Sequence, residues 1–305
     1  MTTATGVPTH MRAAVVEGPR RATVGREVRP DARPGEVLVQ LEGCGVCASD
    51  LPVWEGRPWF DYPLEAGAPG HEAWGVEVAT GQRVALLSHH GYAEYEVVPA
   101  DLVVSLPPEL EGMPFPAEPL GCALNVFARS GVRVGSTVAV VGTGFLGLLL
   151  VQLCVGAAAR TFAFSRREAA LELAREFGAE TPVDVPEESC DIVIEAGGVQ
   201  ETLDLAARLA RVRGRLVIAG YHQDGPRSVD LQSWNWRGLD VVNAHERDPS
   251  VYLDGMHAAV AAVVAGRLDP RPLYTHVLPL HRLGEAFELV RMRPDDFVKA
   301  LVVPS

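Results

Sequence analysis

The sequence is poor in cysteine and has no second pair of closely spaced cysteines. Five cysteines are spread over 305 residues, and one C-x-x-C pair, Cys44 with Cys47, lies in "GCGVCASD". A four-thiolate zinc knot needs two such pairs, and a disulfide framework needs an even, denser set. We therefore expect a reducing, cytoplasmic location. The pair itself could be a redox dithiol, half of a structural zinc site, or one working cysteine with an unrelated neighbour.

Blocks of basic residues are missing too. The chain has 27 Lys and Arg against 39 Asp and Glu, a net charge of −12, and no run of five or six basic side chains. This balance argues against nucleic acid or an anionic membrane surface as a partner, and it favours a small molecule. The N-terminal segment has no charged stretch followed by a long apolar run, so we predict no secretory signal.

The longest apolar segment, residues 138–159, has the length of a membrane span. Gly142, Gly144 and Gly147 interrupt it, and its β-branched residues gather in its first part. We therefore interpret it as a buried strand, a tight turn and a helix.

Two patterns of hydrophobicity divide the chain. Residues 11 to about 110 contain short alternating apolar runs broken by Gly and Pro, which predict strands. From about residue 132, strands and helices alternate, the pattern of an α/β protein with a doubly wound parallel sheet. The strands are expected at 136–142, 160–165, 190–196, 214–220 and 239–244, and the helices at 145–157, 167–177 and 199–211. A helix at 282–292 and a closing strand complete the chain.

The three glycines of "VVGTGFLG" form G-x-G-x-x-G between a strand and a helix. In that context they allow a tight turn, a close approach of the backbone to a pyrophosphate, and close packing of the helix on the strand. Phe145 and Leu146 begin the helix, whose N-terminus faces the anion. We predict a dinucleotide site here.

The next predicted strand ends in "FSRRE", where an acid would bind the ribose of NAD. Ser165, Arg166 and Arg167 suit a 2′-phosphate better, so NADP(H) is favoured over NAD(H). Alternatively, the arginines only begin a solvated helix. Further along the chain, the cofactor residues expected at strand ends are Gly197, Gly220 and Asn243.

Cys47 has candidate zinc partners in "APGHEAWG" and "PAEPLGCALN", namely His71, Glu72 and Glu118. Thiolate, imidazole and carboxylate, with one position left for water or substrate, make up a catalytic zinc site. Taken singly, His71 is as well explained as a surface turn residue and Glu118 as a solvated acid.

The chain resembles the zinc-dependent medium-chain dehydrogenase/reductase family, of the alcohol, sorbitol and threonine dehydrogenase type. The motifs that carry the resemblance are "GCGVCASD", "PGHEAWG", "GYAEYEVVPADLVVSLP", "AEPLGCALN", "VAVVGTGFLGLLLVQL", "CDIVIEAGG" and "FVKALVVP". It implies a GroES-like catalytic domain from residues 1–125 and 268–305, a Rossmann domain from 126–267, and an active site between them. It also implies a homodimer or homotetramer.

The resemblance assigns roles to individual residues. Cys47 and His71 match catalytic zinc ligands, Glu118 matches the third ligand position, and Glu72 matches a neighbouring acid that ligates in some members. Asp50 matches the carboxylate that orients the histidine ligand. Ser49 matches the hydroxyl that meets the substrate alcohol, and Lys299 matches a residue that reaches the pyrophosphate.

Three departures from the family pattern qualify these roles. The structural-zinc lobe is missing between "GHE" and "AEY", so we expect one catalytic zinc and no structural zinc. Pro52 stands where a relay histidine is common. Ser88, His89 and His90 replace an apolar pocket wall, and His89 or His90 could contact a polar substrate or act as the missing base. A polar turn left by the loss of the lobe explains them equally well.

The predicted function is hydride transfer between NADP(H) and a secondary alcohol or ketone, with a polyol, cyclitol or other polar alcohol favoured by Arg57 and the histidine pair. The aromatic residues Trp54, Trp59, Phe60 and Tyr62 either line the substrate pocket or pack within their loop. The alternatives are a zinc-independent reductase of the same superfamily and a protein that binds NADPH without catalysis.

Overall fold

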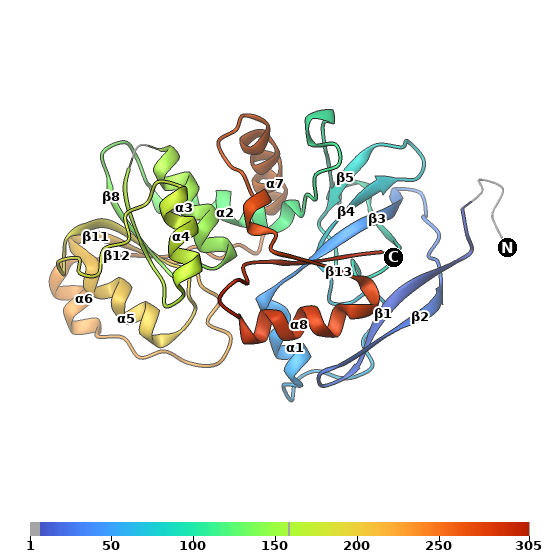
Figure 1. The fold of residues 1–305 in the computed structure, drawn as a ribbon, viewed down its shortest axis with the longest axis horizontal. Coiled ribbons are helices and arrows are strands. Elements are labelled where there is room, and N and C mark those ends of the chain that lie inside the picture. Colours follow the sequence, from blue (N-terminus) through green and yellow to red (C-terminus); the bar gives the residue numbers. More distant parts are fainter. Residues whose placement is uncertain (1–6, 158, 305) are drawn as a thin grey trace. The chain divides into compact units, whose positions relative to one another are not determined.

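The computed structural model describes residues 7–157 and 159–304, and it divides the chain into two compact units (Figure 1). The first unit comprises Met1–Pro119 and Tyr274–Ser305, and the second comprises Leu120–Leu273. The sequence patterns place these boundaries near 125 and 268.

The first unit is rich in strands. Its main sheet has seven strands in the order β13-β14-β3-β4-β5-β7, with β6 paired to β3, and β1 and β2 form a separate hairpin. The strands are β1 (His10–Gly18), β2 (Arg21–Val28), β3 (Glu36–Val46), β4 (Glu72–Glu77), β5 (Arg83–Leu86), β6 (Tyr95–Pro99), β7 (Val103–Ser105), β13 (His276–Pro279) and β14 (Ala300–Val303). The helices are α1 (Leu51–Glu55), α8 (Leu283–Met292) and the short turns η1 (Ala48–Asp50), η2 (Ala100–Leu102), η3 (Pro108–Leu110) and η5 (Leu280–Arg282). The last strand of the chain, β14, pairs with β3, so both ends of the chain build this sheet.

The core of the first unit settles the role of one aromatic residue. Trp54 is buried and stacks on Phe287 with ring centroids 4.8 Å apart, and its indole N–H donates to Glu288 at 2.8 Å. Glu288 also accepts two hydrogen bonds from Arg20, which is the main reason that the pKa of Glu288 falls to about 2. Trp54 is therefore a packing residue and does not line a substrate pocket.

The second unit is the predicted doubly wound sheet. Five parallel strands lie in the order β12-β11-β10-β8-β9. The strands are β8 (Thr137–Val141), β9 (Arg160–Phe164), β10 (Cys190–Glu195), β11 (Ala210–Ile218) and β12 (Asp240–Asn243), and the predicted helices are α3 (Phe145–Gly156), α4 (Glu168–Glu176) and α5 (Gln200–Leu209). These predictions are confirmed to within a few residues at the element ends.

Several helices of the chain have no counterpart among the predicted elements. In addition to α1 and the turns η1, η2 and η3, they are α2 (Ala117–Ser130), which begins in the first unit, α6 (Leu231–Arg237), α7 (Pro249–Val264) and the turn η4 (Arg271–Leu273). The apolar segment that begins at residue 138 forms β8, a turn and α3, as expected. Within the described ranges, none of the helices combines the length and the hydropathy of a membrane span.

Candidate functional site

The "GCGVC" segment lies where three strands of the first unit meet. Cys47 directly follows β3, Gly45 pairs with Glu72 at the start of β4, and Val46 pairs with Ala300 of β14. A side chain at position 45 would collide with the carboxylate of Glu72, because an added Cβ would lie 1.8 Å from Oε2. The glycine therefore makes room for an acid beside Cys47.

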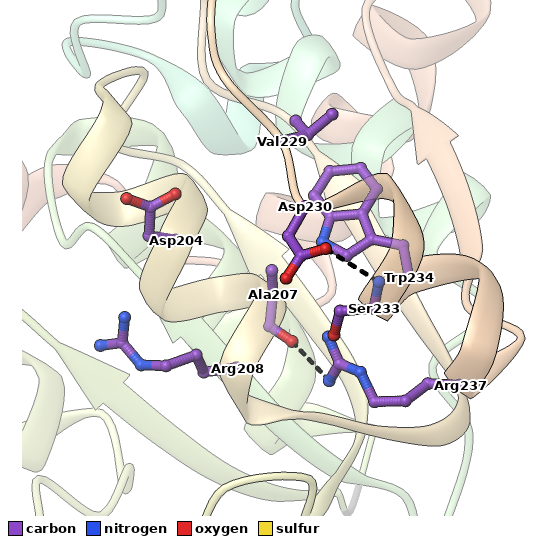
Figure 2. Close-up of a pocket in the computed structure, with 8 residues that line it drawn as sticks. All are labelled: Asp204, Ala207, Arg208, Val229, Asp230, Ser233, Trp234 and Arg237. Carbon is purple, nitrogen blue, oxygen red and sulfur yellow. Dashed lines mark hydrogen bonds between the residues drawn. The ribbon is translucent and has the colours of Figure 1, made fainter.

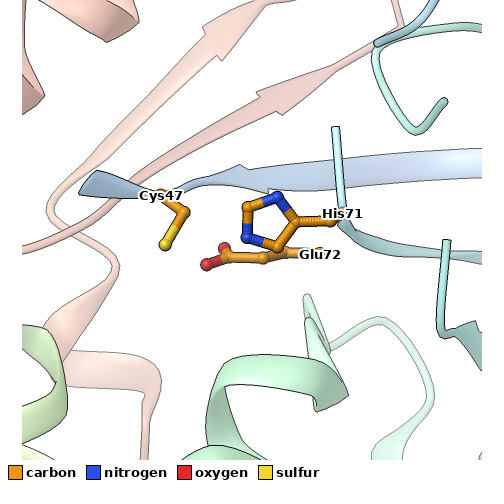
Figure 3. Close-up of side chains that lie close together, drawn as sticks. All are labelled: Cys47, His71 and Glu72. Atoms are coloured by element: carbon orange, nitrogen blue, oxygen red, sulfur yellow. The ribbon is translucent and has the colours of Figure 1, made fainter. Parts of the chain in front are cut away.

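The side chains of Cys47, His71 and Glu72 converge at this point, and Figure 3 shows them pointing toward one another. One ligand atom of each residue lies within 4.8 Å of the others. Thiolate, imidazole and carboxylate are the donor types that bind zinc, so these residues fit the metal that the sequence predicts. Among residues 7–157 and 159–304, the structure contains no other group of three or more His, Cys, Asp or Glu side chains close enough together to hold a metal ion.

The Asp50 carboxylate determines which nitrogen of His71 could bind a metal. Asp50 is buried, and its Oδ1 lies 3.4 Å from Nδ1 of His71, which is also 3.0 Å from the Pro69 carbonyl. Both neighbours are acceptors, so a proton on Nδ1 satisfies them and leaves Nε2 as the nitrogen that could bind a metal. Burial acts to lower the pKa of His71, but Asp50 and Cys47 outweigh it and the pKa is raised well above its usual value.

Glu72 forms a buried ion pair with the only lysine of the chain. Nζ of Lys299 lies 2.6 Å from Oε1 and 2.5 Å from Oε2 of Glu72, and both residues are almost inaccessible to solvent. Burial acts to lower the pKa of Lys299, but the charges of Glu72, Cys47 and Glu118 raise it. That Lys299 contacts the pyrophosphate stays a prediction. Its ammonium is paired with Glu72, which is one of the three candidate metal ligands.

Glu118 and Ser49 lie around this cluster. Glu118 is in the first turn of α2 and lies outside the three-residue group, although its charge acts on Lys299. The Ser49 hydroxyl donates to Sγ of Cys47 at 3.2 Å, so it is next to the atom that would hold the metal. Pro52 is buried in α1 and offers no proton acceptor.

The turn at residues 88–92 packs against the backbone that leads to His71. Gly91 N–H and the Ser88 hydroxyl both donate to the Gly70 carbonyl, and the buried carboxylate of Glu96 accepts from the backbone N–H groups of His89 and His90. Burial is the main cause that raises the pKa of Glu96. These hydrogen bonds hold the turn of residues 88–92, which stands where the family has the structural-zinc lobe. Through the Gly70 carbonyl, the turn also supports the backbone next to His71.

The two histidines of this turn differ in their surroundings. His90 Nε2 lies 3.0 Å from Glu65, whereas the side chain of His89 is exposed. Partial burial lowers the pKa of His89, and the nearby charges of His71 and His90 lower it further. Both rings reach solvent, since the side chain of His90 is 42% exposed, but the ring of His90 is paired with Glu65.

The glycine turn of the second unit has the geometry of a phosphate-binding turn. Gly142 has φ 102°, and a Cβ on Gly147 would lie 1.9 Å from the Gly142 carbonyl oxygen. A Cβ on Gly144 would meet nothing within 4 Å, so this position presents open backbone at the start of α3. Phe145 and Leu146 are half-buried in the first turn of that helix. The turn offers backbone N–H groups and the positive end of a helix to an anion.

The residues predicted to read the ribose lie together after β9. The Ser165 hydroxyl accepts a hydrogen bond from the backbone N–H of Arg167 at 3.2 Å, and the Arg167 guanidinium reaches the Thr143 carbonyl in the glycine turn at 3.4 Å. Arg166 is exposed. One arginine thus contacts the glycine turn, and the other is open to solvent.

The remaining predicted cofactor residues follow three neighbouring strands. Gly197 and Gly220 lie two residues after the ends of β10 and β11, and Asn243 is the last residue of β12. No role is predicted from the sequence for the side chain of Glu195, which is completely buried at the end of β10. The signal was present in "EAGG", an acid at the carboxyl end of a parallel strand before two glycines.

A separate pocket of about 150 Å³ lies between α5 and α6, and none of the predicted site residues lines it (Figure 2). Arg237 donates to the carbonyls of Ala207 and Ala210 at the end of α5, and Asp230 accepts from Ser233 at the start of α6. These contacts satisfy the free groups of two helix ends, so they are structural.

Comparisons with known proteins agree with this description. Residues 33–108 match the alcohol dehydrogenase GroES-like domain, and residues 146–258 match the zinc-binding dehydrogenase family. Erythritol/L-threitol dehydrogenase of Mycolicibacterium smegmatis is 27% identical over 98% of this chain and 99% of its own length. Alcohol dehydrogenase of Geobacillus stearothermophilus is 32% identical over 64% of this chain and 70% of its own length. The solved structure of a Sinorhizobium meliloti protein described as a zinc-binding dehydrogenase, with NADP bound, has a TM-score of 0.83 and 26% identity and covers 97% of this chain and 100% of its own.

Proposed function

This chain belongs to the zinc-dependent medium-chain dehydrogenase/reductase family of NAD(P)-dependent alcohol dehydrogenases, and we propose that it oxidises a polar secondary alcohol with NADP⁺ in a zinc-dependent reaction. The observation that carries the proposal is the convergence of Cys47, His71 and Glu72, with Asp50 behind the histidine. The reverse reaction reduces the ketone.

The bound groups would supply the reactive chemistry, and the side chains would hold and orient them. When bound, a zinc ion supplies a Lewis acid for the substrate oxygen, and the nicotinamide takes up or gives the hydride. Cys47 and His71 would hold the metal, with Glu72 or Glu118 as the carboxylate ligand. Asp50 keeps the proton of His71 on Nδ1, so that Nε2 faces the metal.

Ser49 is the first group available to take up the proton of the alcohol. Its hydroxyl is 3.2 Å from Sγ of Cys47 and can accept one hydrogen bond while it donates another. Pro52 gives this proton no further acceptor, and the exposed His89 is the candidate for the next step.

The proposed preference for NADP(H) has two supports. Arg166 is exposed beside Ser165, where an acid would repel a 2′-phosphate, and Arg167 lies against the phosphate-binding turn. The Sinorhizobium relative contains NADP. A polyol substrate is supported by the erythritol/L-threitol and sorbitol dehydrogenases among the relatives and by the polar His89 near the metal cluster.

The experiment is a panel of secondary alcohols and polyols assayed with NAD⁺ and NADP⁺ in parallel, together with zinc analysis of the active protein. We expect the Arg166→Ala variant to raise KM for NADP⁺ roughly tenfold or more, the loss of one hydrogen bond to a charged group, and to leave KM for NAD⁺ unchanged. A strong preference of the wild type for NAD⁺ would overturn the assignment of Ser165 and Arg166.

A zinc-independent reductase and a non-catalytic NADPH-binding protein are the competing functions. Active protein with less than about half an equivalent of zinc would favour the reductase, since catalytic sites of this kind bind zinc tightly. Cofactor binding without turnover across the whole panel would favour the non-catalytic protein.

A further inference from the structure

Two loops and the start of one helix, at the carboxyl edge of the parallel sheet, meet over one buried carboxylate that the proposed mechanism does not use. Glu195 has no solvent exposure, and its Oε1 accepts hydrogen bonds from the backbone N–H groups of Gly197 and Gly198, at 2.8 and 2.7 Å, and from the Thr202 hydroxyl at 2.6 Å. Its backbone carbonyl accepts from the N–H groups of Ala219 and Gly220. Glu195 thus joins the turn after β10, the start of α5 and the loop after β11.

The second oxygen of Glu195 begins a chain of charged and polar groups. His222 Nε2 lies 3.0 Å from Oε2 of Glu195, and Nε of Arg227 donates to His222 Nδ1 at 2.8 Å. The guanidinium of Arg227 also donates to the Gly198 carbonyl at 2.9 Å and pairs with Asp224. The side chains of His222 and Arg227 are 15% and 14% exposed, so water does not substitute freely for these contacts.

The direction of the hydrogen bonds is fixed by the arginine. A guanidinium can only donate, so His222 Nδ1 must be unprotonated and the ring must be neutral, with its proton on Nε2 pointing at Glu195. Protonation at Nδ1 would place two donors opposite each other. The hydrogen bonds therefore run in one direction, from Arg227 through His222 to Glu195, and they select one tautomer of the histidine. We call this chain of hydrogen bonds the relay.

This relay lies on a defined half of the dinucleotide site. The strand order β12-β11-β10-β8-β9 puts the ribose-reading residues after β9 on one side of the glycine turn, and the ends of β10 and β11 on the other side. A dinucleotide bound across β8 must place its nicotinamide half over the ends of β10 and β11. The glycine turn also packs directly on the turn after β10, because a Cβ on Gly142 would lie 2.6 Å from the backbone N of Gly197.

We propose that Glu195, His222 and Arg227 act as positioning residues that hold residues 196–198 and 219–225 in place as the binding surface for the nicotinamide half of the cofactor. This inference rests on the proposed function, since it assumes that the site takes a nicotinamide dinucleotide. It assigns a role to three side chains that contact neither the metal cluster nor the ribose-reading residues in the contacts given above.

The test compares a whole cofactor with its adenosine half. NADPH and adenosine 2′,5′-bisphosphate are titrated by calorimetry into the wild type and into His222→Leu and His222→Gln. We expect His222→Leu to weaken NADPH binding about tenfold, or about 1.4 kcal/mol, and to change binding of the bisphosphate less than about twofold. His222→Gln should recover NADPH binding to within about threefold, because an amide can donate to Glu195 and accept from Arg227. His257→Leu, at an exposed histidine of α7 in the same unit, is the matched control.

The outcomes distinguish a failure of the positioning role from a failure of the proposed function. Equal NADPH affinity in His222→Leu and the wild type overturns the positioning role, as does an equal loss of NADPH and bisphosphate binding, which would mark a purely structural contact. The nitrogen NMR signals of His222 give a readout that does not depend on variant folding, and a proton on Nδ1 in the wild type overturns the relay. A wild type that binds neither NADPH nor NADH overturns the proposed function itself.

Discussion

Lys299, which the family resemblance assigns to the cofactor, makes its observed side-chain contact with a residue far away in the sequence. The chain uses arginine for its other 26 basic side chains, and its single lysine is buried against Glu72, 227 positions earlier. An ammonium is compact, and it fits beside a buried carboxylate where a planar guanidinium needs more room. The pair compensates the charge of an acid that is also a candidate metal ligand.

We expect Glu72→Gln to destabilise the metal-free protein because it leaves the buried ammonium of Lys299 without its counter-charge. Breaking a buried pair in this way costs about 3–5 kcal/mol, which lowers the melting temperature of a domain of this size by roughly 10 °C. Calorimetry of the chelated protein measures the effect without metal linkage. The double variant Glu72→Gln/Lys299→Met is the control and should regain most of the loss. If the double variant is no more stable than the single one, the pair has no such role.

A second prediction concerns His89 as the proton acceptor that Pro52 cannot provide. Burial and the charges of His71 and His90 lower the pKa of His89, so the neutral, basic form is present down to a lower pH than for an ordinary histidine. Activity should therefore rise with pH through that lowered pKa and stay constant above it. His89→Ala should remove this acidic limb of the pH–rate profile of alcohol oxidation. His90→Ala, whose ring lies against Glu65, should keep it. An unchanged profile in both variants rules out the histidine pair as the base.

At the scale of secondary structure, elements with a regular pattern and punctuation were predictable, and the others were not. The β8, β9, β10 and β11 strands and the helices between them were expected because β-branched runs alternate with amphipathic segments. Helix α7 was missed because its Ala and Val residues surround it without a polar stripe. Its start was nevertheless marked, since Asp248 caps the helix and Pro249 occupies its first turn.

The candidate site likewise has features that could be predicted from the sequence and features that could not. The candidate ligands could be named from the sequence because zinc chemistry limits the residue types, and the glycine turn because phosphate binding limits the backbone. The Glu72 pair with Lys299 and the relay from Arg227 to Glu195 could not be predicted, because each depends on strand register between distant segments. Trp54 was ambiguous for the same reason, since nothing in its loop shows that Phe287 lies beneath it.

The glycines of the α3 turn allow a prediction about this element. Gly147→Ala should destabilise the fold, because its Cβ would collide with backbone at 1.9 Å that no side-chain rotation can clear. Gly144→Ala should leave the melting temperature within about 2 °C, because nothing lies within 4 Å, but should weaken NADPH binding about tenfold or more by occupying the path of the pyrophosphate. Gly156→Ala in the last turn of α3 is the control, since its Cβ is equally unobstructed. A Gly144→Ala variant that binds NADPH like the wild type would place the cofactor elsewhere.

For the whole molecule, the two proposed sites are built from different units. The candidate metal ligands are residues 47, 71 and 72 of the first unit, and the glycine turn comes from residues 142–147 of the second. The net charge of −12 makes the protein as a whole repel an anionic cofactor, so binding must rely on local groups such as Arg166 and the start of α3. Loss of either site should therefore stop hydride transfer without emptying the other.

Metal removal tests this independence. Dialysis against a zinc chelator should lower alcohol oxidation at least 100-fold, or about 2.7 kcal/mol of activation free energy, because a bound zinc ion would supply the Lewis acid that stabilises the developing alkoxide. The NADPH dissociation constant should change less than about threefold, since its binding groups lie in the second unit. Added zinc should restore turnover. Gly144→Ala should show the reverse pattern, with about one equivalent of zinc retained and NADPH binding weakened. If the chelated protein turns over at the wild-type rate, the metal is not catalytic, and the zinc-independent reductase becomes the better account of this chain.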